Sequence, residues 1–79
     1  MLDNDMIDES WPLRPYQKRD LALAYAPDIA PVSALNRLTA WLKFNARLWH
    51  ALQESGYRPR QRQFTTRQVE LIFHYLGRP

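Results

Sequence analysis

Residues 64–76 read Phe-Thr-Thr-Arg-Gln-Val-Glu-Leu-Ile-Phe-His-Tyr-Leu, and this stretch contains the clearest signal for the fold. Thr65 and Gln68 have the spacing of a capping box, in which two side chains bond each other's backbone N–H groups at the start of a helix. Phe64 and Val69 stand where a hydrophobic staple joins the preceding chain to the first turns of such a helix. The sequence therefore predicts a helix that begins directly after Thr65.

Three further helices are expected before this one, because apolar residues recur three and four positions apart. Pro31 suits the first position of a helix, and Asn45 suits the cap of the next. Gly56 fits the left-handed residue of a Schellman motif. The four predicted helices span residues 17–26, 31–44, 46–55 and 66–76. We therefore predict an all-α fold, a small bundle of about four helices that is helix-turn-helix-like in its order.

The core is expected to consist of aliphatic and aromatic side chains, because the chain has no cysteine for a disulfide or a thiolate metal site. The expected members are Leu21, Tyr25, Leu35, Leu38, Trp41, Leu42, Leu48, Trp49, Leu52, Tyr57, Phe64, Val69, Ile72, Phe73 and Leu76. Leu71 and Tyr75 fall on the other face of the last predicted helix. An exposed apolar pair at helical spacing often marks a protein interface. The alternative, which we slightly favour, is that the N-terminal arm covers both side chains through Trp11 and Leu13.

The charged residues divide the chain into an acidic arm, residues 1–15, and a basic helical domain, residues 16–79. The net charge is +3, from eleven Lys and Arg against eight Asp and Glu. Four of the acids are Asp3, Asp5, Asp8 and Glu9, so residues 11–79 carry eleven bases and four acids, a net charge of +7. Because prolines in the arm favour an extended path, we expect it to be flexible or loosely docked through Trp11 and Leu13.

A basic domain points to an acidic partner, although many small proteins are basic for solubility alone. The outer face of the second predicted helix carries Ser33, Asn36 and Lys43, with Arg37 on its flank. In a helix-turn-helix protein the second helix enters the major groove of DNA, where Asn and Arg read adenine and guanine. These four residues are candidate nucleic-acid contacts, while a solvated helix face without a ligand would show similar side chains.

Residues 57–64 hold a second group of candidate contacts, Arg58, Arg60 and Arg62. If this segment is an extended basic wing, the three side chains project to one side about 6.6 Å apart, close to twice the phosphate spacing of one DNA strand. A solvated loop is the other interpretation. We expect the protein to bind DNA or RNA; the alternative is a protein-interaction or homodimerisation module that uses Leu71 and Tyr75 without nucleic acid.

Enzymatic activity is not expected. Two glycines in the whole chain exclude a Gly-rich phosphate loop, and no Ser and His stand at the spacing of a catalytic triad. His50 and Glu54 point away from the predicted core, which indicates a solvated pair rather than a metal site. We expect no catalytic residue, cofactor, metal or small-molecule substrate. No stretch is apolar enough to span a membrane and the N-terminus is unlike a secretory signal, so a cytoplasmic location is expected.

A family resemblance runs through residues 15–79. It rests on Tyr16, Lys18-Arg19-Asp20-Leu21-Ala22, Tyr25 and Pro27, on Ala34, Leu38 and Trp41-Leu42, and on Gly56-Tyr57-Arg58-Pro59, Phe64-Thr65-Thr66-Arg67-Gln68-Val69, Ile72, Leu76-Gly77 and Pro79. In these residues the chain resembles an uncharacterised family of domains of unknown function, found in short proteins of gut anaerobic bacteria. The resemblance implies no activity and no site residue. Separately, the first two predicted helices are similar to the helix-turn-helix units of excisionase-like and regulator proteins.

Overall fold

A computed structural model describes residues 11–79, and its helices follow the predicted order. The helices are α1 (Lys18–Tyr25), α2 (Pro31–Phe44), α3 (Ala46–Glu54) and α4 (Thr66–Leu76). Two short strands, β1 (Tyr16–Gln17) and β2 (Gln63–Phe64), pair antiparallel with Tyr16 opposite Phe64 and Gln17 opposite Gln63. The prediction of an all-α fold with four helices is confirmed, and the two-residue ladder is an addition that the sequence did not indicate.

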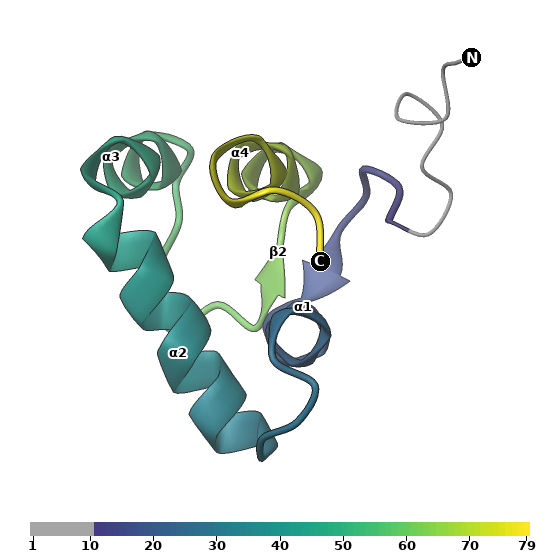
Figure 1. Cartoon of the computed structure of the whole chain (residues 1–79). Coiled ribbons are helices and arrows are strands. Elements are labelled where there is room, and N and C mark those ends of the chain that lie inside the picture. The colour runs from purple at the N-terminus through teal and green to yellow at the C-terminus, as the bar shows by residue number, and fades with distance from the viewer. Residues whose placement is uncertain (1–10) are drawn as a thin grey trace.

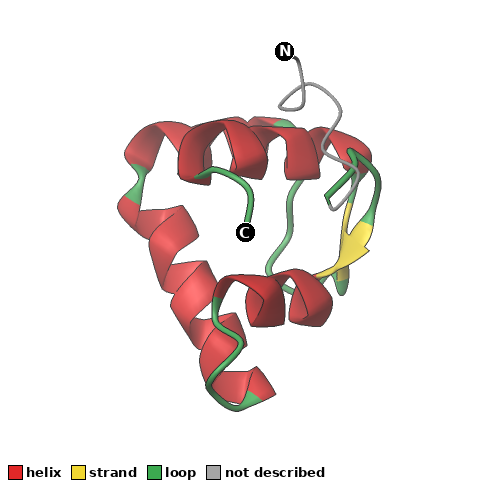
Figure 2. Cartoon of the chain, turned by 45° about the vertical axis from the view of Figure 1, so that its right-hand side comes forward, coloured by secondary structure: helices red, strands yellow, loops and turns green. Residues whose placement is uncertain are grey.

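The helices enclose the core from three sides. In Figure 1, α1, α3 and α4 are seen nearly end-on, while α2 runs across the page and connects the level of α1 to that of α3. Figure 2 shows α3 and α4 above α1, with α2 along one side and the strand pair along the opposite side. Side chains from all four helices and from β2 meet in the middle and are almost completely buried: Leu21, Ala34, Leu38, Leu42, Leu48, Leu52, Phe64, Val69 and Ile72.

The helix ends form as their residues dictate. Thr65 Oγ1 accepts a hydrogen bond from the Gln68 N–H at 3.2 Å, and Gln68 Oε1 accepts one from the Thr65 N–H at 3.1 Å, so the predicted capping box is present. At the end of α3, Gly56 has φ 92° and the Tyr57 N–H bonds the Leu52 carbonyl at 3.0 Å. That pattern is the predicted Schellman motif, and it requires glycine because other residues are strained at positive φ.

The predicted core is largely the observed one. Tyr25, Leu35, Trp49 and Leu76 lie at its edge and are partly buried. The prediction is wrong for Trp41, which is 39% exposed. The buried stripe of α2 consists of Ala34, Leu38 and Leu42, spaced four residues apart, and Trp41 lies beside this stripe. There its ring meets Tyr25 edge-on, with 6.1 Å between ring centres.

Leu71 is only 9% exposed and belongs to the core, so the interpretation of Leu71 as half of an exposed apolar pair is wrong. Helix α4 is covered on two sides rather than one. Gln68, three residues before Leu71 and therefore on the same side of the helix, donates to Ser55 Oγ at 3.2 Å at the end of α3. Phe73, on the other side, packs against Tyr16 with 6.3 Å between ring centres. Burial therefore extends over a wider arc of α4 than the apolar spacing indicated.

The segment before β1 is attached to the domain. Trp11 packs against Tyr16 with 5.7 Å between ring centres, and its carbonyl accepts a hydrogen bond from Arg78 Nε at 3.0 Å. Tyr16 in turn donates to the Pro12 carbonyl at 2.6 Å. Leu13, expected to help in docking, is 46% exposed. The acidic part of the predicted arm, residues 1–10, lies outside the described residues.

The last residues return to α1. The hydroxyl of Tyr25 donates to the Gly77 carbonyl. Burial raises the pKa of Tyr25 above its ordinary value, and the nearby positive charge of Arg78 opposes that rise. The phenol therefore stays protonated and remains a hydrogen-bond donor over the physiological pH range.

The burial of Leu71 gives a stability prediction that separates a core role from an interface role. We expect Leu71→Ala to cost about 2–5 kcal/mol of unfolding free energy, as is usual for a buried leucine. Leu13→Ala removes the same atoms from an exposed position and should cost about 1 kcal/mol or less. Urea denaturation of the two variants and the wild type measures both values. If Leu71 formed an interface instead, its replacement would reduce self-association and leave monomer stability unchanged, and that result would contradict the assignment.

Candidate nucleic-acid interface

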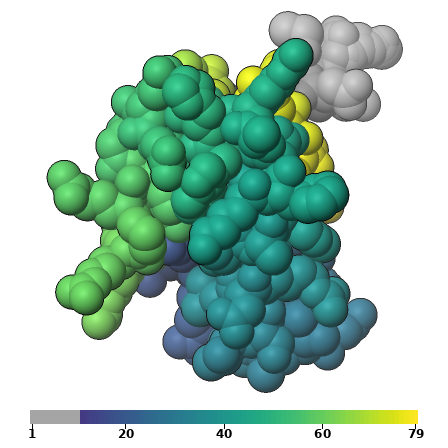
Figure 3. All heavy atoms as spheres, turned by 90° about the vertical axis from the view of Figure 1, so that its left-hand side faces the viewer, coloured from purple at the N-terminus to yellow at the C-terminus, as the bar shows by residue number. Residues whose placement is uncertain are grey.

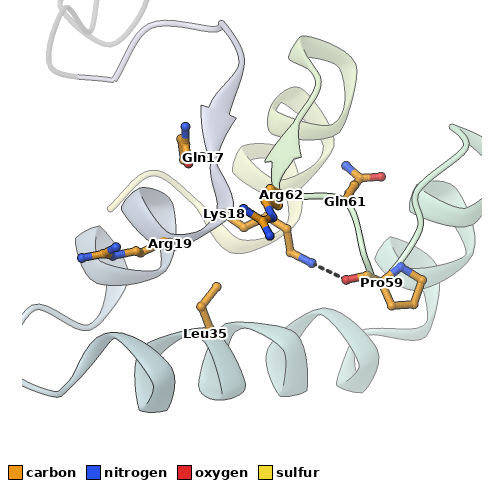
Figure 4. A pocket seen from close by; sticks show the side chains of 7 residues that line it. All are labelled: Gln17, Lys18, Arg19, Leu35, Pro59, Gln61 and Arg62. Atoms are coloured by element: carbon orange, nitrogen blue, oxygen red, sulfur yellow. Dashed lines mark hydrogen bonds between the residues drawn. The ribbon is translucent and has the colours of Figure 1, made fainter.

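A surface cleft of about 390 Å³ lies where the start of α1, the middle of α2 and the loop before β2 come together. Its lining consists of Gln17, Lys18, Arg19, Leu35, Pro59, Gln61 and Arg62. Three of these seven residues are cationic and none is acidic. Figure 4 shows Leu35 rising from α2 as an apolar floor, Lys18 reaching towards Pro59, and Arg19 pointing outward from α1. We call this site the cationic cleft.

The strand pair brings together the two segments that form most of the cationic cleft, residues 17–19 and residues 59–62. Directly beyond the ladder, the Lys18 N–H bonds the Arg62 carbonyl at 2.8 Å, so residues 44 positions apart become neighbours. The ammonium group of Lys18 then holds the loop. It donates to the Tyr57 hydroxyl at 2.9 Å and to the Pro59 carbonyl at 3.1 Å, and it lies 5.0 Å from the centre of the Tyr57 ring.

A buried amide network gives the loop its shape. Gln68 is 1% exposed, and its Oε1 accepts from Gln61 Nε2 at 2.6 Å in addition to its capping bond. Gln61 Oε1 accepts from the Arg58 N–H at 2.9 Å, and the Gln61 N–H bonds the Arg58 carbonyl at 3.1 Å. Residues 58–61 are thereby closed into a turn whose polar groups are satisfied, a condition that buried amides require.

Of the two interpretations that the sequence left open for residues 57–64, this turn favours the loop over the extended wing. Only Gln63 and Phe64 form a strand in the segment 57–64. Arg58 and Arg60 lie in or beside the turn and Arg62 follows it, so the three side chains do not repeat along one extended edge. Arg62 lines the cationic cleft, whereas Arg58 and Arg60 are exposed on the loop next to it. The arginines form a cluster around a turn, and the regular phosphate spacing expected of them is lost.

The outer face of α2 is exposed as the helical spacing predicted. Ser33, Asn36, Arg37 and Lys43 are all exposed. Lys43 lies over the Trp49 ring at 5.8 Å, and Trp49 meets Tyr57 edge-on at 5.7 Å. This contact connects the end of α2 to Tyr57, at the base of residues 58–62, which we call the arginine loop. Figure 3 looks onto α2 and α3 and shows the segment around residue 60 projecting at the edge of the same face.

The charge in this part of the chain is one-sided. Residues 29–66 contain Arg37, Lys43, Arg47, Arg58, Arg60 and Arg62, and a single acid, Glu54. Glu54 pairs with His50 at 3.1 Å and is exposed, the solvated pair expected from the sequence.

Within the described residues no three His, Cys, Asp or Glu side chains come close enough to hold a metal ion. In the same part of the chain, no helix is long and apolar enough to cross a membrane.

Lys18 and Arg19 line the cleft although no pattern in the sequence singled them out as site residues. Their position depends on the ladder, and two residues per strand leave no alternating pattern to detect. Of the other candidate interface, Leu71 is buried and only Tyr75 remains exposed. Tyr75 is 36% exposed and its ring lies edge-on to that of His74 at 4.9 Å.

Fold and site together describe a small helical protein with a cationic cleft and an acid-poor face on α2. The family model described as a domain of unknown function (DUF4248) matches residues 12–79. The chain therefore belongs to this family, as its resemblance in residues 15–79 indicated. Comparison with curated proteins and with solved structures gave no match.

The contacts of Lys18 predict that it holds the arginine loop closed. Lys18→Met keeps the aliphatic stem and removes the bonds to Tyr57 and Pro59. Losing these two bonds, about 1 kcal/mol each, raises the population of the open loop about thirtyfold. We expect trypsin to cleave after Arg60 and Arg62 correspondingly faster, as measured by mass spectrometry of timed digests.

Lys43→Met is the matched control, because Lys43 makes the same kind of ring contact without a bond to the loop. Both variants should keep the helical far-UV spectrum of the wild type. Equal cleavage rates in the two variants would show that Lys18 does not hold the loop.

Proposed function

We propose that this protein binds nucleic acid, with the phosphate backbone lying along the cationic cleft and the arginine loop beside it. The observation that carries the proposal is the composition of the cleft: Lys18, Arg19 and Arg62 line it, no acidic side chain does, and Arg58 and Arg60 are exposed next to it. A polyanion is the ligand class that such a surface favours.

The chemistry of the basic residues supports a phosphate ligand. Nine of the eleven basic residues are arginines, and a guanidinium group can give two parallel hydrogen bonds to a phosphate. Within the described residues, the ion pairs are those of His50 with Glu54 and of Arg67 with Glu70. The arginines of the cleft and loop therefore meet a ligand without first breaking an ion pair with a described carboxylate.

The turn between Arg58 and Gln61 also supports binding. Because hydrogen bonds from Gln61 and Lys18 already order the loop, less conformational entropy is lost when a ligand arrives. The arginine side chains are exposed, and the backbone that carries them does not need to fold on binding. The outer face of α2 would supply further contacts through Asn36 and Arg37, and the helix-turn-helix interpretation of α1 and α2 belongs to this hypothesis.

The proposed activity is binding without catalysis. The lining of the cleft offers no hydroxyl nucleophile, imidazole or carboxylate that could exchange a proton with a substrate. A role on nucleic acid also agrees with the cytoplasmic location that the sequence suggests.

Salt dependence tests the proposal. Non-specific affinity should be weak, with a Kd of about 10⁻⁴–10⁻⁶ M near physiological salt, and log K should fall linearly with log salt concentration. Each phosphate contact contributes about 0.7–0.9 to that slope. We expect Arg62→Gln to reduce the slope by about this amount, and replacement of Arg58, Arg60 and Arg62 together to reduce it by about 2–3. Fluorescence anisotropy of labelled single-stranded and duplex oligonucleotides measures the slope.

Arg67→Gln is the control, since it removes the same charge from α4, where Arg67 is paired with Glu70 at 3.0 Å. This variant should keep the wild-type slope. The proposal fails if the wild type binds neither oligonucleotide at low salt, or if Arg62→Gln and Arg67→Gln change the slope equally.

A further inference from the structure

The most exposed large apolar side chain of the described residues is at the end of α2. Phe44 is 92% exposed, while the other two large apolar side chains exposed on this helix, Val32 and Trp41, are 69% and 39% exposed. Trp41 has a partner in the Tyr25 ring. The ring of Phe44 therefore does little for the packing of the described chain.

The backbone fixes this ring at a corner. Asn45 is extended, with φ −89° and ψ 99°, and its side chain accepts from the Leu48 N–H at 3.0 Å to cap α3. Helix α2 thus ends directly after Phe44 and α3 begins one residue later. The ring stands at the junction of the two helices, and the cap fixes the course of the backbone directly after it.

Three cationic residues lie close to Phe44 along the chain. Arg37 lies seven residues before it on the same face, Lys43 precedes it, and Arg47 is in the first turn of α3. All three are exposed. Residues 29–53 contain no Asp or Glu, so no acid in α2 or in the first two turns of α3 offsets these charges.

We propose that Phe44 is a stacking platform for an unpaired nucleobase, and that the ligand is single-stranded nucleic acid whose phosphates are bound by Arg37, Lys43 and Arg47. The inference rests on the proposed function and narrows it. An aromatic ring among cations is how proteins bind single strands without sequence preference, because every base has a face that can stack. In a duplex those faces are covered by neighbouring base pairs, so a protruding ring would gain nothing there.

A protein partner could also cover the Phe44 ring, but the positive charges of Arg37, Lys43 and Arg47 argue against it. An apolar protein surface would leave the three neighbouring cations without counter-charges at the rim. A single strand supplies a base and phosphates together, since they alternate along its length. Because Lys43 also contacts Trp49 near the arginine loop, a strand on Phe44 can continue towards the cationic cleft.

The test compares a labelled oligothymidylate with a duplex of matched length at one salt concentration. Phe44→Leu keeps an apolar side chain and removes the ring. We expect this variant to bind the single strand about tenfold more weakly, with unchanged duplex affinity and salt slope. Phe44→Trp should restore or exceed wild-type affinity for the single strand. Val32→Ala, an exposed apolar change on the same helix, should alter neither affinity.

The outcomes separate this inference from the proposed function. If the wild type binds nucleic acid and Phe44→Leu leaves single-strand affinity unchanged, or weakens single strand and duplex equally, the stacking role is overturned while the proposed function stands. If the wild type binds neither probe, both fail. A wild type that dimerises in sedimentation equilibrium through Phe44, with unchanged single-strand affinity in the Phe44→Leu monomer, also overturns the stacking role. An equal melting temperature of variant and wild type, expected for so exposed a side chain, confirms that the comparison concerns binding.

Discussion

Tyr16 and Phe64 face each other across the two-residue ladder, and the arrangement of the helices around the core depends on that pairing. Phe64 is completely buried and is at once a strand residue, a stacking partner of Tyr57 at 6.0 Å and the residue before the cap of α4. Tyr16 contacts Trp11 on one side and Phe73 of α4 on the other. An isolated ladder of this length has little stability of its own. The ladder persists because its two aromatic residues are packed against other parts of the fold: Tyr16 against Trp11 and Phe73, and Phe64 against Tyr57.

The same constraint explains which parts of the structure could be predicted from the sequence. Helix positions follow from local signals, such as the Thr65 and Gln68 capping box, so the prediction placed the helices correctly. The ladder depends on residues far apart in the chain, and with two residues per strand it leaves no periodic pattern. Lys18 therefore could not be connected with Arg62 from sequence alone. Leu71 was misjudged for a related reason, because a helix packed on two sides buries a wider arc than its strongest apolar stripe indicates.

The arginine loop shows how a small domain can present charge without losing order. Its turn is closed by Gln61, and Gln61 is held by the nearly buried Gln68, which also caps α4 and contacts Ser55 of α3. One side chain thus joins the loop, the last helix and the end of the third helix. A buried amide is costly unless its groups are bonded, and within the described residues every buried side-chain polar atom has a partner. The free-energy cost of burying Gln68 is offset by its hydrogen bonds to Gln61, Thr65 and Ser55. The bond to Gln61 also helps to hold the loop backbone in one conformation.

One side of helix α2 is packed against the core, and the opposite side is exposed to solvent. Ala34, Leu38 and Leu42 are sufficient to attach it to the core, since these three lie on one line and are almost completely buried. The opposite side has no packing to maintain, so stability places few demands on Ser33, Arg37 or Phe44. A polar residue in place of Phe44 would lower the apolar surface exposed to water at no cost to the core. The packing of the described chain therefore does not explain the exposed ring of Phe44, whereas a ligand that stacks on it from outside, as proposed above, would.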